Sequence, residues 1–174
     1  MVMDARLKKL AKGLDSRATV DAFLRQRTDP TSLSNEQRAL AYEFEATIEA
    51  MFLMAAVDGE ISKQEMGQLA GSVQAIIDIA PSGKRVNLED TLVQLNKKLE
   101  KEGWKSRLDE VARRLQSDEA RSFAFRLAAG VAFIDDHVAH AEAAAIDGLA
   151  AALRLTSDES QEILHDVQET LFAD

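Results

Sequence analysis

The sequence predicts an all-α fold, a single-domain bundle of about seven to nine helices. Apolar residues recur at helical spacing along most of the chain, and no apolar run alternates at period two as a strand would. The 174 residues are 46% hydrophobic and include two prolines, a composition that suits one globular core. Ser/Thr-x-x-Glu/Gln capping boxes and short clusters of Asp, Gly, Pro and Ser separate the periodic segments.

The first 33 residues are expected to form an N-terminal helical extension, and residues 34–174 the helical domain proper. Within residues 4–27, leucines and other apolar residues recur at helical spacing, with Ser16 as the N-cap between two short helices. Residues 27–34 collect Asp, Pro, Thr and Ser, and this composition predicts a loop.

Local signals divide the domain into successive helices. Three capping boxes mark helix starts, at Ser34–Gln37, Ser62–Glu65 and Thr156–Glu159. Gly103 separates two middle helices, and Ser117 is the N-cap of the helix that follows them. The expected helices span about 35–57, 63–79, 88–101, 105–116, 118–134, 141–154 and 157–172.

An internal repeat runs through the domain. The stretch AAVDGEISKQE, residues 55–65, aligns without gaps on AFIDDHVAHAE, residues 132–142, at an offset of 77 residues. The same shift places Ile48 on Phe125 and Leu69 on Ile146, so the match continues into the flanking helices. Two pseudo-symmetric helical hairpins, each with a tight acidic corner, are therefore predicted.

The two corners differ in a way that bears on function. In the first corner, Gly59 suits a tight turn and Ser62 caps the next helix, so capping alone accounts for the motif. In the second corner, Asp136 replaces the glycine and Ala139 replaces the serine, while the acids at both ends of the motif are kept. This pattern favours a role for the acids beyond capping.

These two corner motifs, together with LAAALRLTSDESQEIL further on, resemble the TerB-like family, the tellurite-resistance helical domain. The same domain occurs at the N-terminus of a membrane-anchored J-domain co-chaperone. The resemblance covers about residues 36–170 and implies two related helical hairpins, metal binding by the acids of the two turns, and stress complexes near the inner face of the membrane. By position, the implied metal-binding acids are Asp58, Glu60, Glu65, Asp135, Asp136 and Glu142.

A shared cation site is the chemistry that these acids suggest. Converging carboxylates repel one another unless a cation or a proton neutralises them. Oxygen ligands favour Ca²⁺, Mg²⁺ or Mn²⁺, and the nitrogen donors of His137 and His140, which rank behind the acids, would also admit Zn²⁺. An EF-hand is excluded, because its first two ligand positions would fall on Met54 and Ala56.

Composition excludes several other classes. A net charge of −9 opposes nucleic-acid binding, and the lack of cysteine excludes thiolate chemistry. No apolar stretch reaches the ~18 residues of a membrane span, and no secretory signal is present at the N-terminus, so a cytoplasmic protein is expected. Trp104 is expected to be a packing anchor, and His165 a surface or half-buried residue and not a ligand. The basic cluster Lys97, Lys98, Lys101, Lys105 and Arg107 is interpreted as solvated helix faces, or as a patch for an anionic membrane or an acidic partner.

The sequence thus predicts a non-enzymatic TerB-like module, a divalent-metal-binding scaffold or sensor in a tellurite or chemical stress response. A protein–protein interaction domain without a ligand is the alternative, and a metal-dependent hydrolase is the third hypothesis. The expected partner is a protein, either a component of a membrane-associated stress complex or a second copy of the chain in a homodimer.

Overall fold

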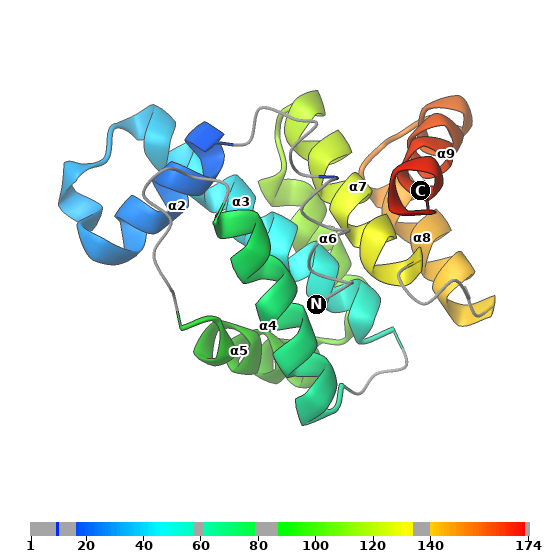
Figure 1. The fold of residues 1–174 in the computed structure, drawn as a ribbon, viewed down its shortest axis with the longest axis horizontal. Helices are drawn as coiled ribbons and strands as arrows, with labels where there is room; N and C mark the ends of the chain where they lie inside the picture. Colours follow the sequence, from blue (N-terminus) through cyan, green and yellow to red (C-terminus); the bar gives the residue numbers. More distant parts are fainter. Residues whose placement is uncertain (1–9, 11–16, 58–60, 79–86, 134–139, 173–174) are drawn as a thin grey trace.

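The computed structural model describes residues 10, 17–57, 61–78, 87–133 and 140–172. In these residues all secondary structure is helical, with eight α-helices, one 3₁₀ turn and no strand (Figure 1). The prediction of an all-α bundle of seven to nine helices is confirmed. The helices are α2 (Arg17–Thr28), η1 (Pro30–Ser32), α3 (Asn35–Ala55), α4 (Lys63–Ile77), α5 (Leu88–Glu102), α6 (Trp104–Arg114), α7 (Asp118–Phe133), α8 (His140–Ala152) and α9 (Ser157–Phe172).

The helix ends of the domain agree with the predicted ones to within about two residues, because local capping chemistry sets them. All three predicted capping boxes are formed, with side-chain and backbone hydrogen bonds of 2.9–3.2 Å. Ser117 Oγ accepts a hydrogen bond of 3.1 Å from the Ala120 backbone N–H at the start of α7, as expected of an N-cap. The predicted N-cap Ser16 lies outside the described residues.

The predicted loop at residues 27–34 is partly wrong. Helix α2 continues to Thr28, and Pro30–Ser32 forms a 3₁₀ turn. Proline at the first position presets the backbone for a helical turn, and the Ser32 N–H donates to the Asp29 carbonyl at 3.2 Å.

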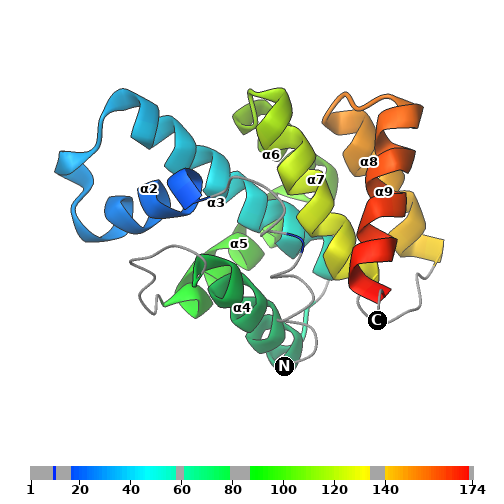
Figure 2. The ribbon, with the colours of Figure 1, turned by 45° about the horizontal axis from the view of Figure 1, so that its top comes forward.

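Helix α3 is the centre of the fold. Almost every residue from Phe44 to Met54 is buried, around the whole helix circumference, because α2, α4, α6, α7 and α8 all pack against it. Figure 2 shows α3 running from the α2 end into the middle of the molecule. The rings of Phe23 and Phe44 meet edge to face, with centroids 5.0 Å apart. Helix α2 therefore shares one hydrophobic core with the domain.

The internal repeat is visible in the helices. Helix α4 begins at Lys63, and α8 includes His140, which is the equivalent position at the offset of 77 residues. Equivalent positions of the two copies are buried alike: Ile48 and Phe125, and Leu69 and Ile146. Helices α3 and α7 pack extensively against each other, while α4 packs on α3 and α5, and α8 packs on α7 and α6. The first helices of the two hairpins therefore form the middle of the bundle.

Gly103 joins α5 to α6 in a conformation that L-residues rarely adopt, with φ 89° and ψ 159°. We expect Gly103→Ala to lower the free energy of unfolding by about 1–3 kcal/mol, because this backbone region is accessible essentially only to glycine. Gly67→Ala is the matched control. An added Cβ has nothing within 4 Å there, the residue is helical, and a gain of up to about 1 kcal/mol is expected. Urea unfolding of both variants checks the prediction, and equal values would contradict it.

Glu159 makes α9 sensitive to acid. Hydrogen bonds from the backbone N–H and then the side chain of Thr156 lower the pKa of Glu159 below its ordinary 4.5. Because the folded-state pKa is lowered, this stabilisation is present above pH 4.5 and disappears as the pH falls through the lowered value. Glu159→Gln should therefore lower Tm near neutral pH more than Glu162→Gln, an exposed acid of the same helix. The difference should vanish in strong acid. Melting curves recorded from neutral pH down into strong acid test this prediction. A difference in Tm between the two variants that stays constant with pH would contradict it.

Candidate functional site

The structure describes little of the predicted metal site. Asp58, Glu60, Asp135, Asp136 and His137 lie outside the described residues. His140 and Glu142 lie in the first turn of α8, but their side chains are not described. The approach of the two corners thus stays a prediction.

Glu65 is the one predicted metal ligand whose side chain is described. Its Oε1 accepts a hydrogen bond of 3.2 Å from the Ser62 N–H, while its own N–H donates to Ser62 Oγ at 3.1 Å. A carboxylate has about four lone-pair directions. Capping of α4 therefore remains compatible with a bond to a cation. Within the described part of the chain, no group of three or more Asp, Glu or His side chains is placed to hold a metal ion.

A buried ion-pair cluster joins α3 to α6, and sequence reasoning did not find it. Glu49 of α3 is 0% exposed. Arg107 of α6 donates two hydrogen bonds to the Glu49 carboxylate, from Nε at 2.7 Å and from Nη2 at 2.8 Å. Arg107 Nη1 also reaches Glu102 at 3.3 Å. These bonds raise the pKa of Arg107, with the Glu49 hydrogen bond as the largest cause.

Arg114 is the second arginine of this cluster. Its Nη1 lies 3.5 Å from Glu49 Oε1, and its Nη2 lies 3.2 Å from Glu45 Oε2. The Nη2 also donates to the Tyr42 carbonyl at 3.4 Å, and the guanidinium carbon sits 4.3 Å from the Tyr42 ring centroid. The Nε of Arg114 is buried without a hydrogen-bond partner. Arg114 is therefore held less tightly than Arg107.

Helical spacing explains how the cluster forms. Trp104, Arg107, Val111 and Arg114 recur at three- and four-residue intervals and lie on one face of α6. At one end of this face, Trp104 Nε1 donates to the Leu53 carbonyl at 2.9 Å, which agrees with its predicted role as a packing anchor. On this buried face of α6, two guanidinium groups occupy positions where apolar side chains are typical.

The interpretation of Arg107 as part of an exposed basic cluster is wrong. Arg107 is 6% exposed, whereas Lys97, Lys98, Lys101 and Lys105 are exposed as expected. The available signal was Glu49, an acid inside the apolar run of residues 44–54, since such a charge needs a buried partner. His165 is exposed as predicted, with Nε2 3.0 Å from Glu169 Oε1.

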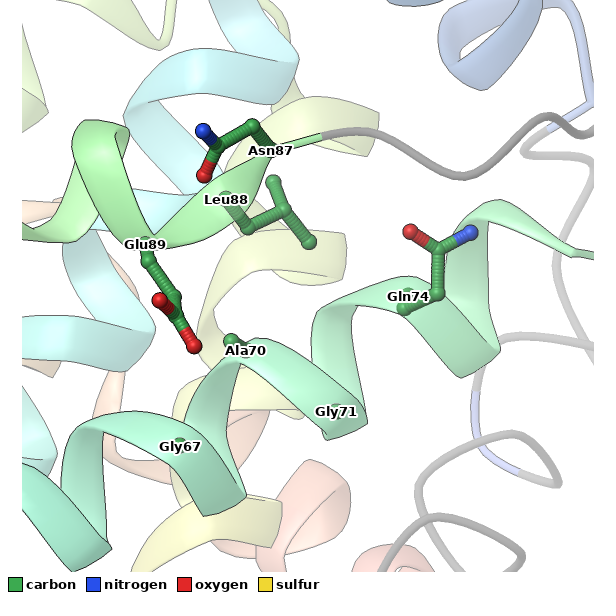
Figure 3. A pocket seen from close by; sticks show the side chains of 7 residues that line it. All are labelled: Gly67, Ala70, Gly71, Gln74, Asn87, Leu88 and Glu89. Carbon is green, nitrogen blue, oxygen red and sulfur yellow. The ribbon is translucent and has the colours of Figure 1, made fainter.

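Two open hollows adjoin these elements. The first, of about 360 Å³, lies between α3 and the α6–α7 connection and is lined by Ala39, Tyr42, Glu43, Arg114, Gln116 and Ser117. The second, of about 430 Å³, lies between α4 and the start of α5 (Figure 3) and is lined by Gly67, Ala70, Gly71, Gln74, Asn87, Leu88 and Glu89. In the second hollow, Asn87 caps α5 through Asp90 N–H, and Gln74 donates to Asp78. The side-chain amides of Gln74 and Asn87 are therefore engaged in contacts at the ends of α4 and α5.

Comparison with known proteins gives no relative: no family model, curated protein or solved structure matches the chain. None of the described helices is long and apolar enough to cross a lipid bilayer. What the fold and the described site define is an all-helical bundle whose buried charges hold one helix against another.

Removing Glu49 should be costly. We expect Glu49→Ala to lower the free energy of unfolding by about 3–5 kcal/mol, because it removes the buried bidentate partner of Arg107 and leaves two buried guanidinium groups with only the more exposed Glu102 and Glu45. Glu110→Ala is the control, since the exposed Arg113–Glu110 pair is worth at most about 1 kcal/mol.

The double variant Glu49→Leu/Arg107→Met separates the missing charge from the missing packing. It should recover about half of the loss, because no isolated charge remains at that position and Arg114 keeps Glu45. Urea unfolding of the three variants measures these effects. A Glu49→Ala loss no larger than that of Glu110→Ala would contradict the assignment.

Proposed function

We propose that the protein is a non-enzymatic TerB-like helical module, which acts as a scaffold or sensor and holds a divalent cation at its two acidic corners. The observation that supports this proposal is the register of the two hairpins. Helices α4 and α8 occupy equivalent positions at an offset of 77 residues, and buried positions match across the same offset. In the sequence, the acids that flank each corner therefore stand at equivalent positions of the repeat.

The ligands in this proposal are oxygen atoms. Asp58 and Glu65 from the first corner, with Asp135 and Glu142 from the second, would bind Ca²⁺, Mg²⁺ or Mn²⁺; His137 and His140 would favour Zn²⁺. The bound cation offsets the mutual repulsion of these carboxylates. A partner then recognises the angle between the hairpins that the cation fixes, in keeping with the stress-response context that the resemblance implies.

A non-enzymatic role fits the way the described buried charges are used. Glu49 is held by two arginines, so its carboxylate is not available as a general base. Arg107 is held in turn by Glu49 and Glu102. These groups hold α6 against α3.

An interaction domain without a ligand is the second candidate. Its support is the capping box of α4, in which Glu65 already has a structural role that needs no cation. In that case the corners are well-formed helix connections, and the partner binds elsewhere on the surface.

Calorimetric titration with Ca²⁺, Mg²⁺, Mn²⁺ and Zn²⁺ tests the cation. We expect heat with at least one of them, lost in Asp58→Asn/Asp135→Asn and kept in the control Asp109→Asn/Asp158→Asn, which removes the same charge from exposed positions. At about 100 times Kd, the cation should add about 2.7 kcal/mol of stability. No heat with any cation, and equal melting midpoints with and without EDTA, would leave the ligand-free interaction domain as the function.

A further inference from the structure

The hollow between α3 and the α6–α7 connection has an exposed aromatic side chain at its edge. Tyr42 is 41% exposed, the most exposed large hydrophobic residue of the described chain. Tyrosine and arginine are among the residue types most enriched at the energetic centres of protein interfaces. Here both types line one hollow of about 360 Å³.

The Tyr42 ring is held in place before any partner arrives. The Arg114 guanidinium stacks on it at 4.3 Å, and Arg114 is itself 8% exposed and tied to Glu45 and Glu49. A ring fixed by a buried neighbour loses little conformational freedom on binding. The hollow is therefore preorganised by the α3–α6 cluster behind it.

The charge around this hollow favours a cation. Glu43 and Arg114 are the charged side chains that line the hollow, and Arg114 is already paired with Glu45 and Glu49. Glu43 is therefore a lining carboxylate whose described partner is the uncharged Ser117. The adjacent Arg113–Glu110 pair is neutral. The net charge of the whole chain, −9, attracts basic partners as well.

Glu43 is the carboxylate of the lining that is best placed to bind a cationic group. Its Oε2 accepts from Ser117 N–H at 3.4 Å and from Ser117 Oγ at 3.3 Å. Both contacts are longer than the roughly 2.5–2.9 Å of strong charge-assisted hydrogen bonds. A cationic group that approaches Glu43 closely therefore replaces weak contacts with a stronger one.

We infer that this hollow receives a lysine or arginine side chain from a basic segment of a partner protein. Tyr42 supplies an aromatic surface, Glu43 supplies the carboxylate, and Arg114 is the positioning residue that holds the ring. The inference rests on the proposed function as an interaction module and adds the chemical class of the partner. It does not depend on the corners.

The test titrates the ¹⁵N-labelled full chain with the blocked tripeptides Ac-Gly-Lys-Gly-NH₂ and Ac-Gly-Arg-Gly-NH₂, and with Ac-Gly-Glu-Gly-NH₂ as the acidic comparison. We expect saturable amide shifts centred on Tyr42, Glu43 and Ser117, with Kd on the order of millimolar for a single side chain. Tyr42→Leu and Glu43→Gln should each weaken binding by about fivefold. The control Glu36→Gln, an exposed acid of the same helix, should change Kd by less than about 1.5-fold.

Three results would overturn the inference: no localised shifts, equal weakening by Glu36→Gln, or equally tight binding of the acidic tripeptide. The ¹⁵N spectrum of each variant shows whether that variant is folded. If Tyr42→Leu does not fold, the test rests on Glu43→Gln. Asp58→Asn/Asp135→Asn separates the two proposals. Basic peptides that bind this variant normally support the docking hollow even where the cation is lost. Cation heat in the unaltered chain, together with no localised peptide shifts, supports the corners alone.

Discussion

The fold depends on one buried carboxylate. Glu49 lies in the second half of α3, the helix against which most of the other described helices pack, and the two arginines of α6 offset the cost of burying its charge. Helix α6 therefore cannot slide or turn on α3 without exposing an unpaired charge to the core. Through Arg114, the same carboxylate also fixes Tyr42 at the surface. The interior and the proposed docking hollow are thus parts of one network of contacts.

The cluster contributes more to specificity than to net stability. Desolvation of the charges largely offsets their attraction, so a buried ion pair is often no better than a hydrophobic replacement. Helix α6, however, has 11 residues and few fully buried apolar ones, chiefly Leu108 and Val111. Such a short apolar contact would fit several registers on α3. The bidentate geometry of Arg107 on Glu49 is compatible with a single register. Fixing the register of two helices is the role of buried charge that is best supported physically.

The sequence predicted what is local and missed what is distant. Helix starts follow from a cap and a residue three positions later, so Ser34, Ser62 and Thr156 could be recognised directly. Arg107 could not be placed in the same way, because its burial depends on Glu49, 58 residues away in the chain. Helical periodicity alone predicts that an arginine lies on the solvent-exposed face of a helix. The Tyr42 hollow was missed for the same reason, since it needs α3 beside the α6–α7 connection.

Trp104 extends the α3–α6 contact to the second hairpin. Its indole N–H donates to Leu53, a carbonyl in the last turn of α3, where helix carbonyls lack a full set of intrahelical donors. On the side of the other hairpin, a Cβ atom at Gly148 of α8 would lie 4.0 Å from Trp104 Cζ3, so the ring reaches the backbone of α8. The end of α3, just before the first corner, and the helix that follows the second corner are thus held by one side chain. Within the described core, the helix that precedes the first corner, α3, and the helix that follows the second, α8, therefore both lie against Trp104.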